Sequence, residues 1–202
     1  NESFSLNGAA AMESVEFMAS KMDEFGTPSA YNHYAVGWAH AMDTPYQWTK
    51  QVASHFGGTR NGLVISWPER IKDHGGLRSQ FCHVIDIVPT IYEAIGIAPP
   101  KVVNGVEQQP IDGTSLVYTF DEASVSTRHS TQYFALVGNR AIYKDGWMAC
   151  TRHDRIPWET ASQGTPFSED RFELFDLRSD PGEGTDLRER EPERYREMVE
   201  LW

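Results

Sequence analysis

Residues 50–61 read KQVASHFGGTRN, and residues 63–68 after them read LVISWP. The double glycine at Gly57 and Gly58 allows positive φ and a close approach of the backbone to another group. The apolar run that follows predicts a short buried strand, ended by its terminal proline. We therefore expect a turn at the edge of a sheet, with the charged residues of the first stretch held beside it.

Two side chains of residues 50–61 are candidates for binding an anion. The ammonium of Lys50 and the imidazole of His55 precede the turn, and such donors suit an oxyanion such as sulfate or phosphate. Arg60, just after the turn, is expected to pin the loop through carbonyl groups or a carboxylate. From residue chemistry alone, the alternatives are a solvated lysine and a histidine that only fixes the turn.

The segments around this stretch predict an α/β layer. A short helix is expected over residues 48–52, and residues 84–95 carry apolar side chains on one helical face. Asp86 can cap that helix, and Gly96 ends it. A strand, a connection and a helix in this order are typical of α/β layers.

Residues 29–45 are rich in aromatic and small side chains and are predicted to form an irregular ordered loop. A loop of this length indicates a wall around a site. Trp38 and His40 are the candidate substrate-binding residues there, since an indole can stack on an aromatic or sugar ring and an imidazole can line a cleft. Packing within the wall is the alternative for both.

The second half of the sequence has a different character. Short runs at residues 132–137, 140–144 and 147–152 are separated by Gly-Asn and Asp-Gly pairs, which favour antiparallel hairpins. Residues 172–177 predict a further strand, and Pro192 opens a C-terminal helix. These elements predict a small α+β unit with an antiparallel sheet and one packed helix.

Composition excludes some partners. The chain of 202 residues has a formal net charge of -11, which argues against a nucleic-acid partner because phosphate backbones need a basic surface. No window approaches the roughly 18 apolar residues of a membrane span. Cys82 and Cys150 could bridge or stay free, and the apolar neighbours of Cys82 predict a small buried thiol.

Three stretches of the sequence resemble type I sulfatases, the arylsulfatase family of the alkaline-phosphatase-like superfamily. Residues 44–68 are similar to the family segment in which an active-site lysine is followed by Gly-Gly-x-Arg and a strand ending in Trp-Pro or Tyr-Pro. Residues 84–91, VIDIVPTI, and residues 173–183, ELFDLRSDPGE, follow in the family's order. The resemblance implies the C-terminal portion of a sulfatase. Residues 1–115 would complete an α/β alkaline-phosphatase-like domain, and residues 116–202 would form a small α+β domain.

The resemblance implies that the whole enzyme hydrolyses the sulfate ester of a small molecule or a glycan. Lys50 then corresponds to the lysine that binds a sulfate oxygen and neutralises charge on the leaving group, and His55 is the second catalytic candidate. Six residues separate Lys50 from Gly57 where many members have five, so we expect a one-residue bulge. The alternatives are a phosphonate or phosphate monoester hydrolase of the same superfamily, and a non-catalytic glycan-binding module that uses Trp38 or Trp48.

Calcium and a formylglycine nucleophile are the cofactors that the resemblance implies for the whole enzyme. The family makes formylglycine from a cysteine or serine in the motif C/S-x-P/A-x-R; neither Cys82 nor Cys150 lies in such a motif, and we expect none in this chain. The Asp-Asp and Asp-Asn pairs that bind calcium in the family are absent from the sequence. The carboxylates of residues 173–183 are expected to serve a strand and a turn. We therefore expect this chain to bind no metal, to lack the nucleophile, and to be inactive without the remainder of the sulfatase chain.

Overall fold

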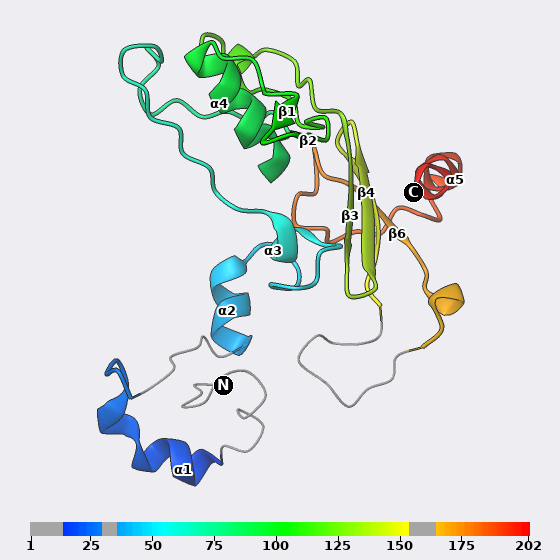
Figure 1. The fold of residues 1–202 in the computed structure, drawn as a ribbon. Helices are drawn as coiled ribbons and strands as arrows, with labels where there is room; N and C mark the ends of the chain where they lie inside the picture. Colours follow the sequence, from blue (N-terminus) through cyan, green and yellow to red (C-terminus); the bar gives the residue numbers. More distant parts are fainter. Residues whose placement is uncertain (1–13, 30–35, 154–164) are drawn as a thin grey trace.

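The structure is a computed structural model that describes residues 14–29, 36–153 and 165–202. Its helices and strands follow one another along the chain as Figure 1 shows. The α-helices are α1 (Val15–Ser20), α2 (Val36–Asp43), α3 (Phe56–Thr59), α4 (Ile87–Ile95) and α5 (Pro192–Leu201), and short 3-10 turns are η2 (Met22–Glu24), η3 (Val84–Asp86), η4 (Val117–Thr119) and η5 (Phe167–Glu169). The strands are β1 (Val102–Val103), β2 (Val106–Glu107), β3 (Thr131–Leu136), β4 (Asn139–Lys144), β5 (Trp147–Thr151) and β6 (Glu173–Asp176). None of the helices in the described part is long and apolar enough to cross a membrane.

The main sheet is antiparallel, with strand order β3-β4-β5-β6, as the second half of the sequence predicts. The turn between β4 and β5 is the expected Asp145-Gly146 pair, and both residues have positive φ. The turn between β3 and β4 lies one residue earlier than predicted, at Val137 and Gly138. Asn139 instead begins β4, because its buried side chain is held by the carbonyl of Leu136 and by other backbone groups.

Both faces of the main sheet are buried at β4, β5 and β6, whereas the edge strand β3 is largely exposed. One face holds Ala141, Tyr143, Met148, Cys150 and Phe175, against which the rings of Phe56 and Phe81 pack. The other face holds Ile142, Ala149, Phe172 and Leu174, and α5 covers it with Met198, Tyr195 and Val199. Figure 1 shows α5 lying beside this sheet. The predicted C-terminal helix and its packing against the sheet are thus confirmed.

The helix predicted over residues 84–95 is confirmed for Ile87–Ile95, which form α4, whereas Val84–Asp86 form the 3-10 turn η3. Helix α4 follows η3 and ends at Gly96, whose φ of 69° is the left-handed conformation that glycine adopts readily. Asp86 has a different role from the predicted cap of α4. Its carboxylate accepts from the backbone N–H of His83 at 2.8 Å, which closes a capping box on η3, and from the backbone N–H of Thr114 at 2.7 Å. Its further contact, with Nδ1 of His129 at 2.8 Å, ties the helix start to the segment that leads into the main sheet.

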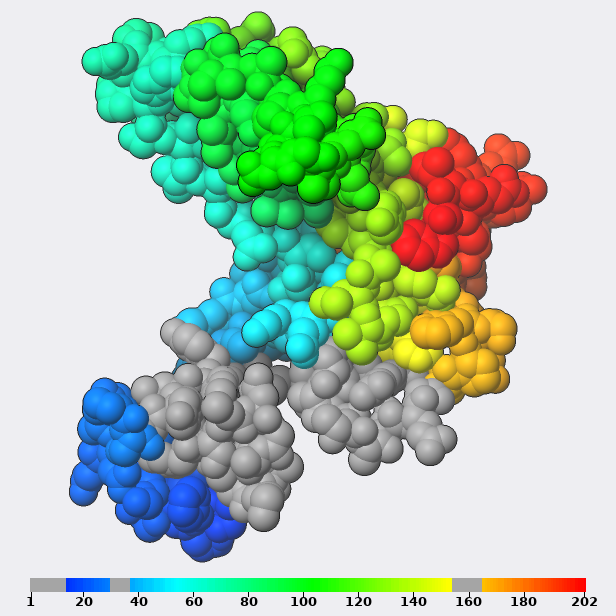
Figure 2. Space-filling model, in the orientation of Figure 1, coloured from blue at the N-terminus to red at the C-terminus, as the bar shows by residue number. Residues whose placement is uncertain are grey.

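One face of α4 is apolar and exposed. Val88, Ile91 and Ile95 are each about half exposed, and an apolar groove of about 250 Å³ separates α4 from residues 63–67. The prediction of a buried strand over residues 63–67 is wrong, because they form no strand and Val64 is 91% exposed. A strand needs a neighbour for its backbone groups, and no described strand pairs with this run. Figure 2 shows the residues of α4 and of the β1–β2 hairpin gathered in one lobe.

Three further expectations are corrected. Residues 48–52 form no helix, because Trp48 and Gln51 adopt positive φ of 66° and 77°. Within the predicted irregular loop over residues 29–45, residues 36–43 form helix α2, while 30–35 lie outside the described residues. Cys82 is exposed rather than buried, and both cysteines are free thiols.

Candidate functional site

The turn after Lys50 is fixed by a close backbone approach. The N–H of Gly57 donates to the carbonyl of Gln47 at 2.9 Å. A Cβ on Gly58 would lie 2.0 Å from the carbonyl oxygen of Val52, and a Cβ on Gly57 would lie 2.2 Å from that of Gln47. The predicted close approach is therefore confirmed. The predicted positive φ is not, since neither glycine is among the positive-φ residues of the chain.

The same segment is anchored to the C-terminal part of the chain. The backbone N–H of Phe56 donates to both carboxylate oxygens of Glu183, at 3.2 and 3.0 Å. The side-chain amide of Gln47 donates to the backbone carbonyl of Glu183, and that of Asn139 donates to the carbonyl of Gln51 at 3.2 Å. The residues on either side of Lys50 are thus held in place by contacts to distant parts of the chain.

Lys50 itself is exposed, and within the described ranges no hydrogen bond or ion pair engages its ammonium. It lies between Trp48 and Gln51, which both have positive φ, so the backbone turns sharply where the extra residue of this segment is expected to bulge. The guanidinium of Arg152 lies 4.6 Å from the ring centre of Trp48. The arrangement presents the ammonium of Lys50 on a fixed loop whose Trp48 ring packs against the guanidinium of Arg152.

Arg60 pins the loop, as expected, but through rings. Its guanidinium carbon lies 4.8 Å from the ring centre of Tyr46 and 5.3 Å from that of Phe56. A guanidinium at such distances is attracted to the negative face of an aromatic ring. Arg60 therefore supports the segment that carries Lys50.

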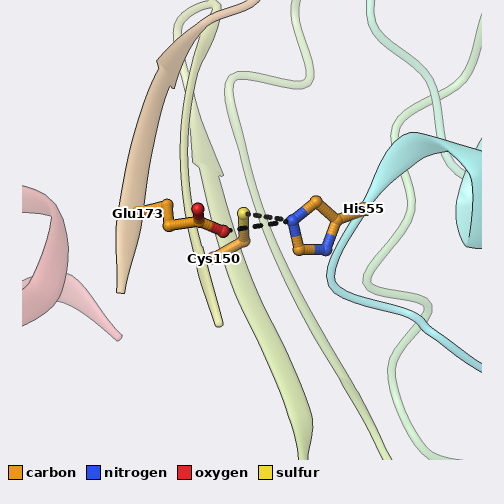
Figure 3. Close-up of side chains that lie close together, drawn as sticks. All are labelled: His55, Cys150 and Glu173. Atoms are coloured by element: carbon orange, nitrogen blue, oxygen red, sulfur yellow. Dashed lines mark hydrogen bonds and ion pairs between the residues drawn. The ribbon is translucent and has the colours of Figure 1, made fainter. Parts of the chain in front are cut away.

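His55 faces the main sheet. Its side chain is 1% exposed, and Nδ1 lies 2.9 Å from the hydroxyl of Ser54. Nε2 lies 3.6 Å from Sγ of Cys150 and 3.5 Å from a carboxylate oxygen of Glu173, as Figure 3 shows. The structure therefore places His55 in the core and Lys50 at the surface. The predicted donation from His55 to a sulfate oxygen gains no support from this placement.

Trp38 and His40 both lie exposed on α2, and Trp38 is 65% exposed. Residues two apart on a helix point to different sides, so α2 does not bring these two side chains together. Their predicted contact with substrate stays a prediction. A large exposed indole is nevertheless available on this helix.

A five-residue motif overlaps the end of the run over residues 63–68. Residues 66–70 read SWPER, which fits C/S-x-P/A-x-R letter by letter, so the expectation that the chain holds no such motif is wrong. Ser66 and Trp67 line the apolar groove beside α4, and Arg70 pairs with the carboxylate of Asp121. By the resemblance to sulfatases, Trp67 and Pro68 of this run are the Trp-Pro pair that ends the segment carrying the active-site lysine. Ser66 therefore needs its own control in any assay of activity.

Three chemically important residues of the site are not predicted from the sequence: Cys150, Glu173 and Glu183. They lie on β5, on β6 and in the turn after β6, and only the fold brings them near His55 and Phe56. The Asp-Pro-Gly-Glu run correctly indicates a turn, since Asp180 accepts from the backbone N–H groups after it. Nothing in the run indicates that the glutamate is buried.

The pKa of Glu183 is raised to about 8, and burial is the largest cause. The hydrogen bond from Phe56 N–H opposes this shift, and the nearby carboxylates of Asp180 and Glu173 add to it. Burial also raises the pKa of the Cys150 thiol, and Glu183 and Glu173 add to this shift. The interior around Cys150 is therefore rich in groups that could carry negative charge.

We predict that stability falls as the pH rises through this window. The pKa of Glu183 is above its ordinary value of 4.5, so between pH 4.5 and about 8 the folded chain keeps a proton that the unfolded chain has released. Unfolding then releases a proton, and the free energy of unfolding decreases with pH, by about 1.4 kcal/mol for each pKa unit of the shift. Glu183→Gln cannot ionise and keeps an acceptor for Phe56 N–H, so its stability should vary less with pH.

Urea unfolding at about pH 5 and about pH 8 measures this effect. The exposed Glu189, changed to glutamine, is the matched control and should follow the wild-type profile. A wild-type and a Glu183→Gln profile with equal slopes would show that the carboxyl is already ionised in the folded chain.

The described residues do not fit calcium. Calcium takes six to eight oxygen ligands. Among the described side chains, the group that could share one ion is His55, Cys150 and Glu173, which offers one nitrogen, one sulfur and one carboxylate. Cys150 lies inside strand β5, outside any formylglycine motif. We therefore assign no step of a reaction in this chain to calcium or to a formylglycine at Cys150.

Comparisons with known proteins support the resemblance to sulfatases. The chain is 32% identical to an arylsulfatase of Klebsiella aerogenes over 94 residues, which is 46% of this chain and 20% of that protein. It is 26% identical to an uncharacterized sulfatase of Schizosaccharomyces pombe over 191 residues, 93% of this chain and 32% of that protein. No protein-family model matches the sequence.

The fold is also similar to that of a solved structure. A 6S-sulf protein, described in connection with glycosaminoglycan metabolism by Bacteroides thetaiotaomicron, matches 74% of this chain and 30% of its own with a TM-score of 0.55 and 20% identity. This likeness shows a shared fold. The chain thus spans about a third or less of the length of the curated relatives that it matches.

Proposed function

We propose that this chain, a sulfatase homologue that corresponds to a C-terminal portion of the family, forms part of a sulfuric ester hydrolase and supplies Lys50 to its sulfate site. The observation that carries the proposal is an exposed lysine without a partner among the described residues, on a segment fixed at both ends. An ammonium held this way can neutralise an oxyanion with little reorganisation.

Two roles follow for the lysine during ester hydrolysis. Its positive charge would attract the sulfate group and hold one of its oxygens. As the ester bond breaks, negative charge develops on the leaving oxygen, and the same ammonium would stabilise that charge. The nucleophile and the calcium ligands of the whole enzyme would lie in the part of a sulfatase that has no counterpart in this chain.

The exposed apolar face supports a place within a larger α/β domain. Residues 63–67 and α4 present apolar side chains around a groove, and soluble proteins rarely leave such a face uncovered. A strand of the remaining domain beside residues 63–67 would supply the missing backbone partners. We propose that residues 1–115 complete this domain and that residues 116–202, with the main sheet and α5, form the small C-terminal domain.

Two alternative functions can be distinguished from sulfate-ester hydrolysis by the ligand that each would take. A phosphonate or phosphate monoester hydrolase of the same superfamily would also use an exposed lysine for its anionic ester. A glycan-binding module would use the exposed indole of Trp38 and would bind unsulfated glycans equally well. The fixed lysine favours an anionic substrate over the second alternative.

The discriminating experiment uses the longer protein, meaning this chain extended by the part that supplies the nucleophile and the calcium ligands. We expect it to hydrolyse an aryl sulfate with a much higher kcat/KM than the corresponding aryl phosphate or phosphonate. A preference for the phosphate or phosphonate ester would move the assignment to that alternative. Binding of unsulfated glycans that Trp38→Ala abolishes, with no turnover of either ester, would favour the binding module.

A further inference from the structure

We propose that His55, Cys150 and Glu173 form a binding site for one zinc-like divalent transition-metal ion, which ties the turn after Lys50 to the main sheet. The site is separate from the calcium that the whole sulfatase is expected to use. It also does not depend on the proposed activity, because its test reads metal binding and stability.

The distances fit a tetrahedral ion. Zinc binds nitrogen and carboxylate oxygen at about 2.0 Å and thiolate sulfur at about 2.3 Å, so tetrahedral ligands are separated by about 3.6 Å for N to S and about 3.3 Å for N to O. In the structure, Nε2 of His55 lies 3.6 Å from Sγ of Cys150 and 3.5 Å from a carboxylate oxygen of Glu173. All three ligand atoms lie within 4.8 Å of one another. Tetrahedral O and S ligands lie about 3.5 Å apart, so a movement of about 1.3 Å or less by the carboxylate would close the set.

The three ligand atoms also point to one place. In Figure 3 the imidazole nitrogen Nε2 faces both the sulfur and the carboxylate, across the gap between the turn and strands β5 and β6. Cys150 and Glu173 are directly paired neighbours in the sheet register, so their side chains emerge on the same face. The sheet thus fixes two ligands, and the turn supplies the third.

The surroundings prepare the histidine for this role. Nδ1 of His55 lies 2.9 Å from the hydroxyl of Ser54, which is itself buried. A proton on Nδ1 that is donated to this hydroxyl leaves the lone pair of Nε2 free for a metal, and such outer partners orient metal-binding imidazoles. The other two ligands are acidic groups. Metal binding displaces the thiol proton of Cys150 to the solvent, and the charge of the ion then stabilises a thiolate that burial alone disfavours.

The donor set selects the ion. One thiolate, one imidazole and one carboxylate suit zinc and cobalt and do not suit calcium or magnesium, which take oxygen ligands. The side chain of Glu173 is 42% exposed, whereas those of His55 and Cys150 are buried, so an ion can enter from the Glu173 side. Water would take the fourth position.

Cobalt titration of the metal-free 202-residue chain tests the proposal directly. The chain is first treated with a chelator, and its absorption spectrum is then followed as Co²⁺ is added. We expect a thiolate-to-cobalt charge-transfer band and intense visible bands of a tetrahedral ion, saturating at one equivalent and displaced by Zn²⁺. The melting temperature should rise with Zn²⁺ concentration and should not respond to Ca²⁺.

Matched variants locate the site. Cys150→Ser should abolish the charge-transfer band, whereas Cys82→Ser, which removes the other thiol, should keep it. Ser54→Ala should weaken binding about 10- to 100-fold. The exposed His74, changed to glutamine, should have no effect.

Each result of these titrations either supports or overturns the metal site. A wild-type chain without the charge-transfer band, or a band that survives in Cys150→Ser, overturns the proposal. If Cys150→Ser does not fold, Glu173→Gln decides, because the partly exposed carboxylate can be changed with little disturbance. Reduced affinity and altered visible bands in Glu173→Gln support the three-ligand site, and unchanged binding contradicts it.

Discussion

Replacing Lys50 by alanine in the longer protein is expected to lower kcat/KM for an aryl sulfate about 100- to 1,000-fold. The ammonium would act most strongly in the transition state, when charge builds on the leaving oxygen, so kcat should fall more than KM rises. The stability of the chain should hardly change, because Lys50 is exposed and its ammonium has no partner among the described residues. Steady-state kinetics together with urea unfolding separate these two effects.

The controls for this prediction are other cationic side chains. Lys101 is also exposed and lies before the β1–β2 hairpin, so Lys101→Ala should keep the wild-type kinetics. Lys50→Arg keeps the charge in a different shape and should recover part of the activity. An unchanged kcat/KM in Lys50→Ala would remove the lysine from the sulfate site.

Replacing Gly58 by alanine is expected to destabilise the chain by about 3 kcal/mol or more. The new Cβ would lie 2.0 Å from the carbonyl oxygen of Val52, a backbone atom that cannot move away as a flexible side chain could. The turn must then shift. Because the same turn holds the residues that flank Lys50, activity of the longer protein should fall together with stability.

Gly62 provides the matched control. A Cβ there meets no atom within 4 Å, and the residue does not have positive φ. Gly62→Ala should therefore change the free energy of unfolding only slightly. Thermal and urea unfolding compare the two variants, and equal stabilities would show that the close approach at Gly58 relaxes easily.

The elements that can be predicted from the sequence are those with local signals. Helix α4 has an apolar face and a terminal Gly96, and helix α5 begins at Pro192. The Asp145-Gly146 pair indicates a two-residue turn wherever it joins two apolar runs. These features depend on neighbours along the chain, so the sequence alone is sufficient for them.

Features that depend on distant partners are not predicted correctly from the sequence. Residues 63–67 have the composition of a strand, but no described strand lies beside them to pair with. His55 has the character of a solvent-facing donor in the sequence, because its neighbours along the chain do not reveal the sheet that buries it. Cys150 and Glu173 come from strands about a hundred residues further along the chain, and only the sheet register brings them together.

The prediction for Lys50 draws on both the sequence and the structure. Its place before the glycine turn can be read from the sequence, and the structure adds that the segment is anchored through Glu183 and Asn139. Whether the lysine contacts sulfate depends on the part of the enzyme that faces it. Kinetics on the longer protein, which contains that part, test whether Lys50 contacts sulfate.

The central claim, that this chain is one part of a sulfatase, is tested most directly by aryl sulfate turnover in the presence of calcium. The purified 202-residue chain and the longer protein are assayed side by side, with Ser66→Ala included in both. We predict no turnover by the chain alone and calcium-dependent turnover by the longer protein, unaffected by Ser66→Ala. Calcium-dependent turnover by the chain alone, lost in Ser66→Ala, would contradict the claim and would identify Ser66 as the source of the nucleophile.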